Sequence, residues 1–178
     1  MLHKTTLFVT FLLASAGTAI FAQETKKGSV PSPPADTSVT IDGKKIGIEY
    51  AAPSMRERKI FGGLVPYGQV WRTGANAATT LKTEADLDIN GLQVPKGEYT
   101  LYTLPSQNGM MLIVNKQTGQ WGTEYSQGQD LGRVKMTMSR PPAPIETFKI
   151  TLTGDGGKKG KLTMAWENTA ASVPFTVK

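Results

Sequence analysis

The residues best suited to chemistry in this chain lie in a stretch from residue 53 to residue 80, PSMRERKIFGGLVPYGQVWRTGANAATT. An arginine there offers a planar fork for carboxylate, phosphate or sulfate, and an asparagine supplies amide donors and an acceptor. The candidate ligand-binding residues of this stretch are Arg56, Arg72, Thr73 and Asn76. A purely structural interpretation stays open, in which Arg72 pairs with an internal acid and Trp71 is a core residue.

A second polar stretch, NKQTGQWGTEYSQGQD, begins at residue 115 and contains two aromatic residues on which a sugar or an aromatic ring can rest. Its candidate residues, with the arginine that follows it, are Asn115, Trp121, Tyr125 and Arg133. We expect the two stretches to meet, because the loops of a β-sandwich gather at the ends of its sheets. Glu124 and Asp130 are an alternative acid and base pair for cleaving glycans.

Several kinds of site are excluded by the residues that are missing. The one histidine is His3, at the extreme N-terminus, and there is no cysteine. A chain from which His3 has been removed has no Ser-His-Asp or Cys-His catalysis and no zinc site of the usual kind. We therefore predict no metal and no cofactor, and we favour a protein that is not an enzyme. The alternating acidic residues Glu84, Asp86 and Asp88 are typical of a solvated strand face. A calcium site is the alternative interpretation, although the residue spacing of a calcium-binding loop is lacking.

The N-terminus predicts export. Residues 1–22 have a short basic start, an apolar run and small residues before a cut after Ala22, as in a secretory signal peptide. Residues 23–35 are rich in proline and lysine and are interpreted as a flexible linker, and residues 36–178 as one domain. We expect a periplasmic or extracellular protein with no membrane anchor after cleavage, of undetermined oligomeric state. An uncleaved membrane anchor is the alternative interpretation of the apolar run, which borders on the length that spans a membrane.

The charge argues against one class of partner. The formal charge of +6 falls to +5 when Lys4 is removed with the leader, and the basic residues are scattered among acids. This pattern gives no support to nucleic-acid binding, whereas a small anionic or glycan ligand is compatible with it.

The domain is expected to be all-β. Asp42-Gly43 and Asn90-Gly91 each interrupt alternating apolar residues, which is a strong signal for a hairpin. About ten short strands without a convincing helix predict an antiparallel β-sandwich, jelly-roll-like, with a closed barrel as the alternative. Residues 54–68 have no period and are expected to form a structured loop, and QVWRT and TTLKT to form a strand–turn–strand corner.

Several segments together resemble one known family. GGLVPYGQVWRTGAN, GLQVPKGEYTLYTLP, LIVNKQTGQWGTEY and MAWENTAASVPFTV make the chain similar to the bacterial exported domain of unknown function 2911. The resemblance spans about residues 39–177 and implies an exported β-rich domain, but no catalytic residues. Two positions depart from it: Glu57 stands where the family commonly has glycine, and Ala77 where it commonly has glutamate.

Three functions are compatible with these observations. We prefer a non-enzymatic module that binds an anionic or sugar-like ligand. The alternatives are a carboxylate-dependent glycan hydrolase and a structural or partner-binding envelope domain.

Overall fold

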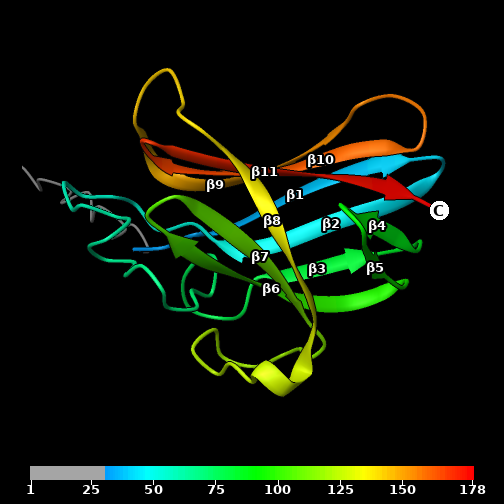
Figure 1. The fold of residues 1–178 in the computed structure, drawn as a ribbon, viewed down its shortest axis with the longest axis horizontal. Helices are drawn as coiled ribbons and strands as arrows, with labels where there is room; N and C mark the ends of the chain where they lie inside the picture. Colours follow the sequence, from blue (N-terminus) through cyan, green and yellow to red (C-terminus); the bar gives the residue numbers. More distant parts are fainter. Residues whose placement is uncertain (1–30) are drawn as a thin grey trace, which may run out of the picture.

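The computed structural model describes residues 31–178, which form an antiparallel β-protein with one short turn of 3-10 helix (Figure 1). The predicted signal peptide and most of the predicted linker lie outside the described residues. The strands are β1 (Pro34–Ile41), β2 (Lys44–Ala51), β3 (Thr80–Thr83), β4 (Leu87–Ile89), β5 (Leu92–Val94), β6 (Gly97–Ser106), β7 (Gly109–Asn115), β8 (Asp130–Ser139), β9 (Ile145–Gly154), β10 (Lys159–Glu167) and β11 (Thr169–Val177). Pro34 and Ala35, placed in the linker by the sequence analysis, are part of β1.

One strand joins two layers. The strands follow the order β1-β2-β3-β6-β7-β8-β11-β10-β9, with β4 and β5 added beside β11. Residues of β8 from Asp130 to Met136 pair with β7, and those from Thr137 to Ser139 pair with β11, so β8 leaves one layer and enters the other (Figure 1). A strand that changes layers makes a corner between packed sheets.

The end strand β9 meets β1, the end of β2 and Pro53 without a continuous backbone ladder. The amide of Ile150 donates to the Tyr50 hydroxyl at 3.0 Å, and the amide of Leu152 donates to Thr37 Oγ1 at 3.2 Å. The amide of Phe148 donates to the carbonyl of Pro53 at 2.9 Å. This row of contacts, called the seam below, satisfies amides along the edge of β9 and nearly closes the sheet into a barrel. The all-β antiparallel prediction is confirmed, with an architecture between the predicted sandwich and its barrel alternative.

Both predicted hairpins are confirmed. Ile41 pairs with Lys44 across Asp42-Gly43, and Ile89 pairs with Leu92 across Asn90-Gly91. All four turn residues have positive φ, from 49° at Asn90 to 95° at Gly91. A two-residue turn with this backbone matches the twist of the flanking strands.

The predicted strand at QVWRT is wrong. Trp71 makes a single bridge to Thr103 of β6, and the chain then turns away because Thr73 adopts a φ of 56°. The prediction for residues 54–68 is confirmed, since they form a loop held by local hydrogen bonds.

An aromatic cluster lies where this loop meets both layers. The Trp71 ring is stacked on Trp166 with centroids 5.6 Å apart and packs edge-on against Phe148 at 5.0 Å and Phe61 at 6.1 Å. Such pairs stabilise a core beyond the burial of their area. The cluster therefore anchors the segment that carries Arg72. In residues 31–178 no helix has the length and apolar character needed to cross a membrane.

Candidate functional site

Arg72 is held by its two neighbours in the chain. Trp71 exchanges two backbone hydrogen bonds with Thr103, at 2.8 and 2.9 Å. Thr73 is fully buried, donates its hydroxyl to Thr103 Oγ1 at 3.2 Å, and accepts at its carbonyl from Thr79 Oγ1 at 2.8 Å. A positive φ is strained for a β-branched residue, and strain of this kind persists only where surrounding contacts enforce it. Thr73 thus fixes the direction in which the chain leaves Arg72.

The two polar stretches meet at Arg72, which is the arrangement expected from the sequence. The Gly122 amide donates to the Asn76 carbonyl at 3.0 Å, and the Ala78 amide donates to the Gln120 carbonyl at 3.3 Å. A Cβ at Gly122 would lie 2.6 Å from Arg72 Cδ and 2.8 Å from the Asn76 oxygen. Glycine is therefore required for the second loop to pass over the arginine stem.

A cavity of about 410 Å³ opens beside Arg72. Its polar and aromatic walls include Arg58, Arg72, Tyr102, Thr123, Tyr125 and the two stacked tryptophans, Trp71 and Trp166. Apolar side chains complete it, among them Val65, Val70 and Ala75. The volume falls within the roughly 300–1,000 Å³ that small-molecule sites occupy.

The cavity is positively charged. It is lined by two arginines, and none of the described residues that line it is acidic. Arg58 donates from Nε to the Met55 carbonyl at 3.0 Å and from Nη2 to the Ser54 carbonyl at 2.8 Å. Arg72 makes no hydrogen bond or ion pair within residues 31–178, and its buried Nε lacks a partner there. A buried donor without a partner is unfavourable, so Arg72 is the arginine of the cavity whose hydrogen-bonding groups are unused within the described residues.

Three of the predicted residues lie together in a separate network that supports the second loop. Asp130 accepts from Asn115 Nδ2 at 2.9 Å, from the Tyr125 hydroxyl at 2.8 Å, and from Nε and Nη2 of Arg133 at 2.9 and 2.8 Å. Nη2 of Arg133 also donates to the Tyr125 hydroxyl at 2.7 Å. We call these four residues the Asp130 network. It fixes one end of the loop that forms the cavity wall.

The tyrosines of the site remain neutral over the usual pH range. Burial raises the pKa of Tyr102 above its ordinary value of 10. Burial also raises the pKa of Tyr125, and its hydrogen bond to Asp130 adds to the effect. The hydrogen bond with Asp130 raises the pKa of Arg133. The Tyr125 hydroxyl therefore keeps its proton and can donate it to Asp130.

The predicted site residues divide into three groups. Arg72 and Tyr125 line the cavity, while Thr73, Asn115 and Arg133 hold its walls from behind. Arg56, Asn76 and Trp121 are exposed and are not among the residues that line it. The Asn76 carbonyl nevertheless joins the two loops, and Trp121 pairs with Ala77.

Sequence reasoning missed most of the residues that line this site, among them Arg58, Tyr102, Gly122 and Trp166. Arg58 was visible as a neighbour of Arg56. Tyr102 lies in β6, where both faces are apolar, and alternation therefore could not indicate which face meets the cavity. Gly122 could have been noticed in the sequence because it directly follows Trp121, one of the candidate residues.

The acidic residues singled out from the sequence have local structural roles. Glu84 accepts from the Lys45 amide, Asp86 from the Lys96 amide, and Asp88 from the Gly91 amide. No cluster of three metal-ligating side chains occurs in the part of the chain that the structure describes. Both carboxylate oxygens of Asp130 accept bonds within its network, and Glu124 is exposed outside the cavity lining.

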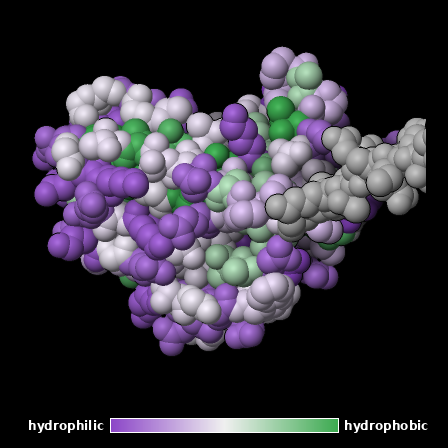
Figure 2. Space-filling view, turned by 180° about the vertical axis from the view of Figure 1, so that it is seen from behind, coloured by the Kyte–Doolittle hydropathy of each residue, from purple (hydrophilic) through white to green (hydrophobic). Residues whose placement is uncertain are grey.

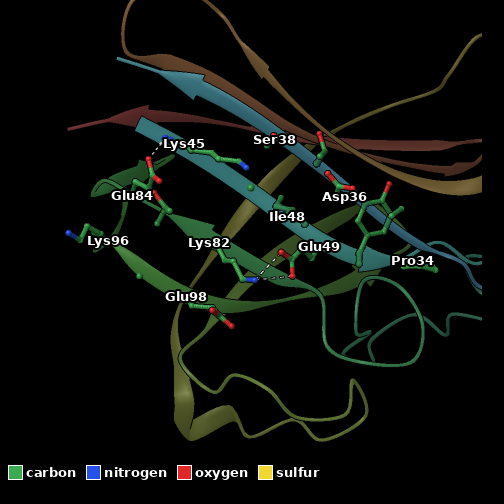
Figure 3. Close-up of a pocket in the computed structure, with 16 residues that line it drawn as sticks. Pro34, Asp36, Ser38, Lys45, Ile48, Glu49, Lys82, Glu84, Lys96 and Glu98 are labelled. Carbon is green, nitrogen blue, oxygen red and sulfur yellow. Dashed lines mark hydrogen bonds and ion pairs between the residues drawn. The ribbon is translucent and has the colours of Figure 1, made fainter. Parts of the chain in front are cut away.

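A larger hollow of the described domain lies elsewhere. A groove of about 1030 Å³ crosses the outer face of β1, β2, β3 and β6 (Figure 3). Its exposed residues include both lysines and carboxylates, and one pair bonds directly, with Lys82 Nζ 2.9 Å from both oxygens of Glu49. Exposed pairs of this kind contribute little energy. We therefore interpret the groove as a solvated sheet face and place the candidate site at Arg72.

Figure 2 shows the hydropathy of the face seen from behind. Hydrophilic residues cover most of that face, and hydrophobic residues appear in small patches (Figure 2). Extended apolar surface, which marks docking sites for proteins, is not seen in this view.

Comparison with known proteins identifies the family. A family model described as "Protein of unknown function (DUF2911)" matches residues 32–175. The chain belongs to the DUF2911 family. A comparison with curated proteins and another with solved structures found no match.

The departures from the DUF2911 pattern can now be placed. Glu57 has a φ of 62°, in the left-handed region that glycine adopts most easily. This backbone explains why glycine suits the position. Ala77 is exposed at the bridge to Trp121, outside the residues that line the cavity.

Proposed function

We propose that this DUF2911 protein is a non-enzymatic module that binds an anionic or sugar-like ligand in the Arg72 cavity. The observation that carries the proposal is the buried Nε of Arg72, which has no partner within the described residues. Arg72 lines a cavity that has aromatic walls and, among the described residues, no acidic lining residue. An arginine in such surroundings is suited to binding an acceptor from a ligand.

The test is thermal stabilisation by a panel of carboxylates, phosphate, sulfate and glycans. A ligand present at 100 times its dissociation constant adds about 2.7 kcal/mol to the free energy of unfolding. We expect Arg72→Ala to lose this stabilisation and Arg56→Ala, a change at an exposed arginine outside the cavity lining, to keep it. Arg72→Lys tests separately whether a positive charge is enough for ligand binding without the planar guanidinium group.

The structural alternative makes a different prediction. If Arg72 only maintains the fold, Arg72→Ala lowers the melting temperature and no member of the panel raises it in the natural protein. That outcome would reject the binding proposal.

A further inference from the structure

We infer that the ligand is a small carboxylate with a flat apolar body, not a sugar. This inference rests on the proposed binding function and narrows it to a chemical class. It follows from which polar groups of the aromatic walls are already bonded within the described residues.

The aromatic walls have no polar groups left for a sugar. The Tyr102 hydroxyl donates to the Glu124 carbonyl at 2.9 Å and lies 3.0 Å from Gln120 Nε2. The Tyr125 hydroxyl is bonded within the Asp130 network, and Trp166 Nε1 donates to the Glu146 carbonyl at 3.1 Å. A sugar carries hydroxyls around its whole ring, and each one buried without a partner weakens binding. The half-buried Trp71 and Tyr125 instead offer parts of their rings, whereas Tyr102 and Trp166 are buried behind them.

The cationic groups fit a single planar anion. Arg58 has two nitrogens bonded to backbone carbonyls, so it contributes positive charge more than directed bonds. Arg72 makes no hydrogen bond or ion pair within residues 31–178; its Nε is buried, and its two Nη nitrogens are the part of the fork left for a ligand. The two oxygens of a carboxylate match two nitrogens of such a fork in parallel hydrogen bonds.

The remaining walls fit an apolar body. Val65, Val70 and Ala75 line the cavity together with the stacked Trp71 and Trp166. A flat ring packs favourably against aromatic faces. A volume of about 410 Å³ leaves room for a molecule of the size of an aryl-acetic acid.

The experiment compares probes that differ in one group. Binding of benzoate, phenylacetate, 3-phenylpropionate and indole-3-acetate is measured by titration calorimetry, beside the amide of each acid, glucose and glucuronate. We expect at least one aryl carboxylate to bind about tenfold or more tightly than its amide, because a charge-assisted pair is lost in the amide. Glucuronate keeps the carboxylate but lacks the apolar body, and we expect it to bind more weakly than the best aryl acid.

Variants locate the binding. Arg72→Met should remove the preference for the acid over its amide, and Ala75→Leu, which fills the cavity, should weaken both. Arg56→Met changes an exposed arginine outside the lining and should leave both affinities as they are. If Arg72→Met does not fold, the ratio of acid to amide affinity in the natural protein and the affinities of Ala75→Leu still test the inference.

The possible outcomes distinguish this inference from the proposed binding function on which it rests. Glucose or glucuronate binding more tightly than every aryl acid, in a manner that depends on Arg72, would overturn the inference and leave the binding function intact. Equal affinity for acids and amides would also overturn it. If the affinity for aryl acids is unchanged in both Arg72→Met and Ala75→Leu, the acids bind outside the cavity, and the inference is rejected. No binding by any of these probes rejects it, and the function itself fails only if the wider panel of anions and glycans is also without effect.

Discussion

Asn115 illustrates how single residues hold the site in shape. It is fully buried, donates to the Ser126 carbonyl and to Asp130 at 2.9 Å each, and accepts from the Gln117 amide at 2.9 Å. Each of these partners belongs to or borders the second loop. The side chain thus ties both ends of the loop to the end of β7.

We expect Asn115→Leu, which keeps the volume and removes the amide, to lower the free energy of unfolding by about 2–4 kcal/mol. Buried groups left without a partner cost about 1–3 kcal/mol each. Urea denaturation measures the loss, and Arg56→Ala at the exposed surface serves as the control, with a change within about 0.5 kcal/mol. A loss at Asn115 no larger than that of the control would show that the loop does not depend on these bonds.

Glu57 offers the opposite test, a substitution that stabilises. Its φ of 62° is unfavourable for an L-residue by about 1–2 kcal/mol, and glycine relieves this strain at a smaller cost in chain entropy. We expect Glu57→Gly to raise the free energy of unfolding by about 0.5–1 kcal/mol. The matched control is Lys59→Gly, at an exposed position of the same loop without a positive φ, which should be destabilising. Equal effects from the two glycines would contradict the explanation from backbone strain.

At the scale of elements, the closeness of the two loops depends on Gly122. Alanine there would bring Cβ to 2.6 Å from Arg72 Cδ and to 2.8 Å from a backbone oxygen. We expect Gly122→Ala to destabilise the protein by about 1–3 kcal/mol and to weaken any ligand that depends on Arg72. Gly128→Ala, in the same loop with open space around the new methyl group, should be close to neutral. Melting curves of the two variants compare them directly, and indistinguishable curves would show that the loops can separate freely.

The elements predicted best from the sequence are those whose backbone conformation depends on residues adjacent in the chain. The hairpins at Asp42-Gly43 and Asn90-Gly91 follow from two turn residues that accept positive φ. The segment around Trp71 alternates like a strand, but it pairs at one position only, since Thr73 turns it toward Arg72. That turn is enforced by Thr103, thirty residues away in sequence, and no local pattern reports such a contact.

The same distinction applies to the site. Arg72 was recognisable because an arginine beside tryptophan, threonine and asparagine is unusual in a strand–turn segment. Tyr102 and Trp166 were not recognisable, because a buried aromatic residue that faces a cavity has the same sequence pattern as one that faces the core. Asn115 and Arg133 were expected to touch a ligand, and their contacts in the structure are with Asp130.

At the scale of the whole molecule, closure of the sheet depends on side chains at the seam. Tyr50→Phe and Thr37→Val each remove the oxygen that accepts an edge amide of β9, while Tyr50→Phe keeps the ring that packs on Phe148. We expect the amides of Ile150 and Leu152, respectively, to exchange with solvent about tenfold faster. Hydrogen exchange followed by NMR measures this effect, with Thr40→Val on the exposed face of β1 as the control. Unchanged exchange in both variants would mean that the seam is closed by packing alone.

The position of the cavity also bears on how the protein is handled. Ser32, near the first described residue, lines the cavity, whereas Lys178 lies at the far end of the domain, where its amide donates to the Asp86 carbonyl at 3.0 Å (Figure 1). A label or tag fused ahead of Ser32 is therefore placed beside the mouth of the cavity. Immobilisation through the C-terminus keeps the mouth accessible, so a sensor surface prepared that way presents the cavity to the solution.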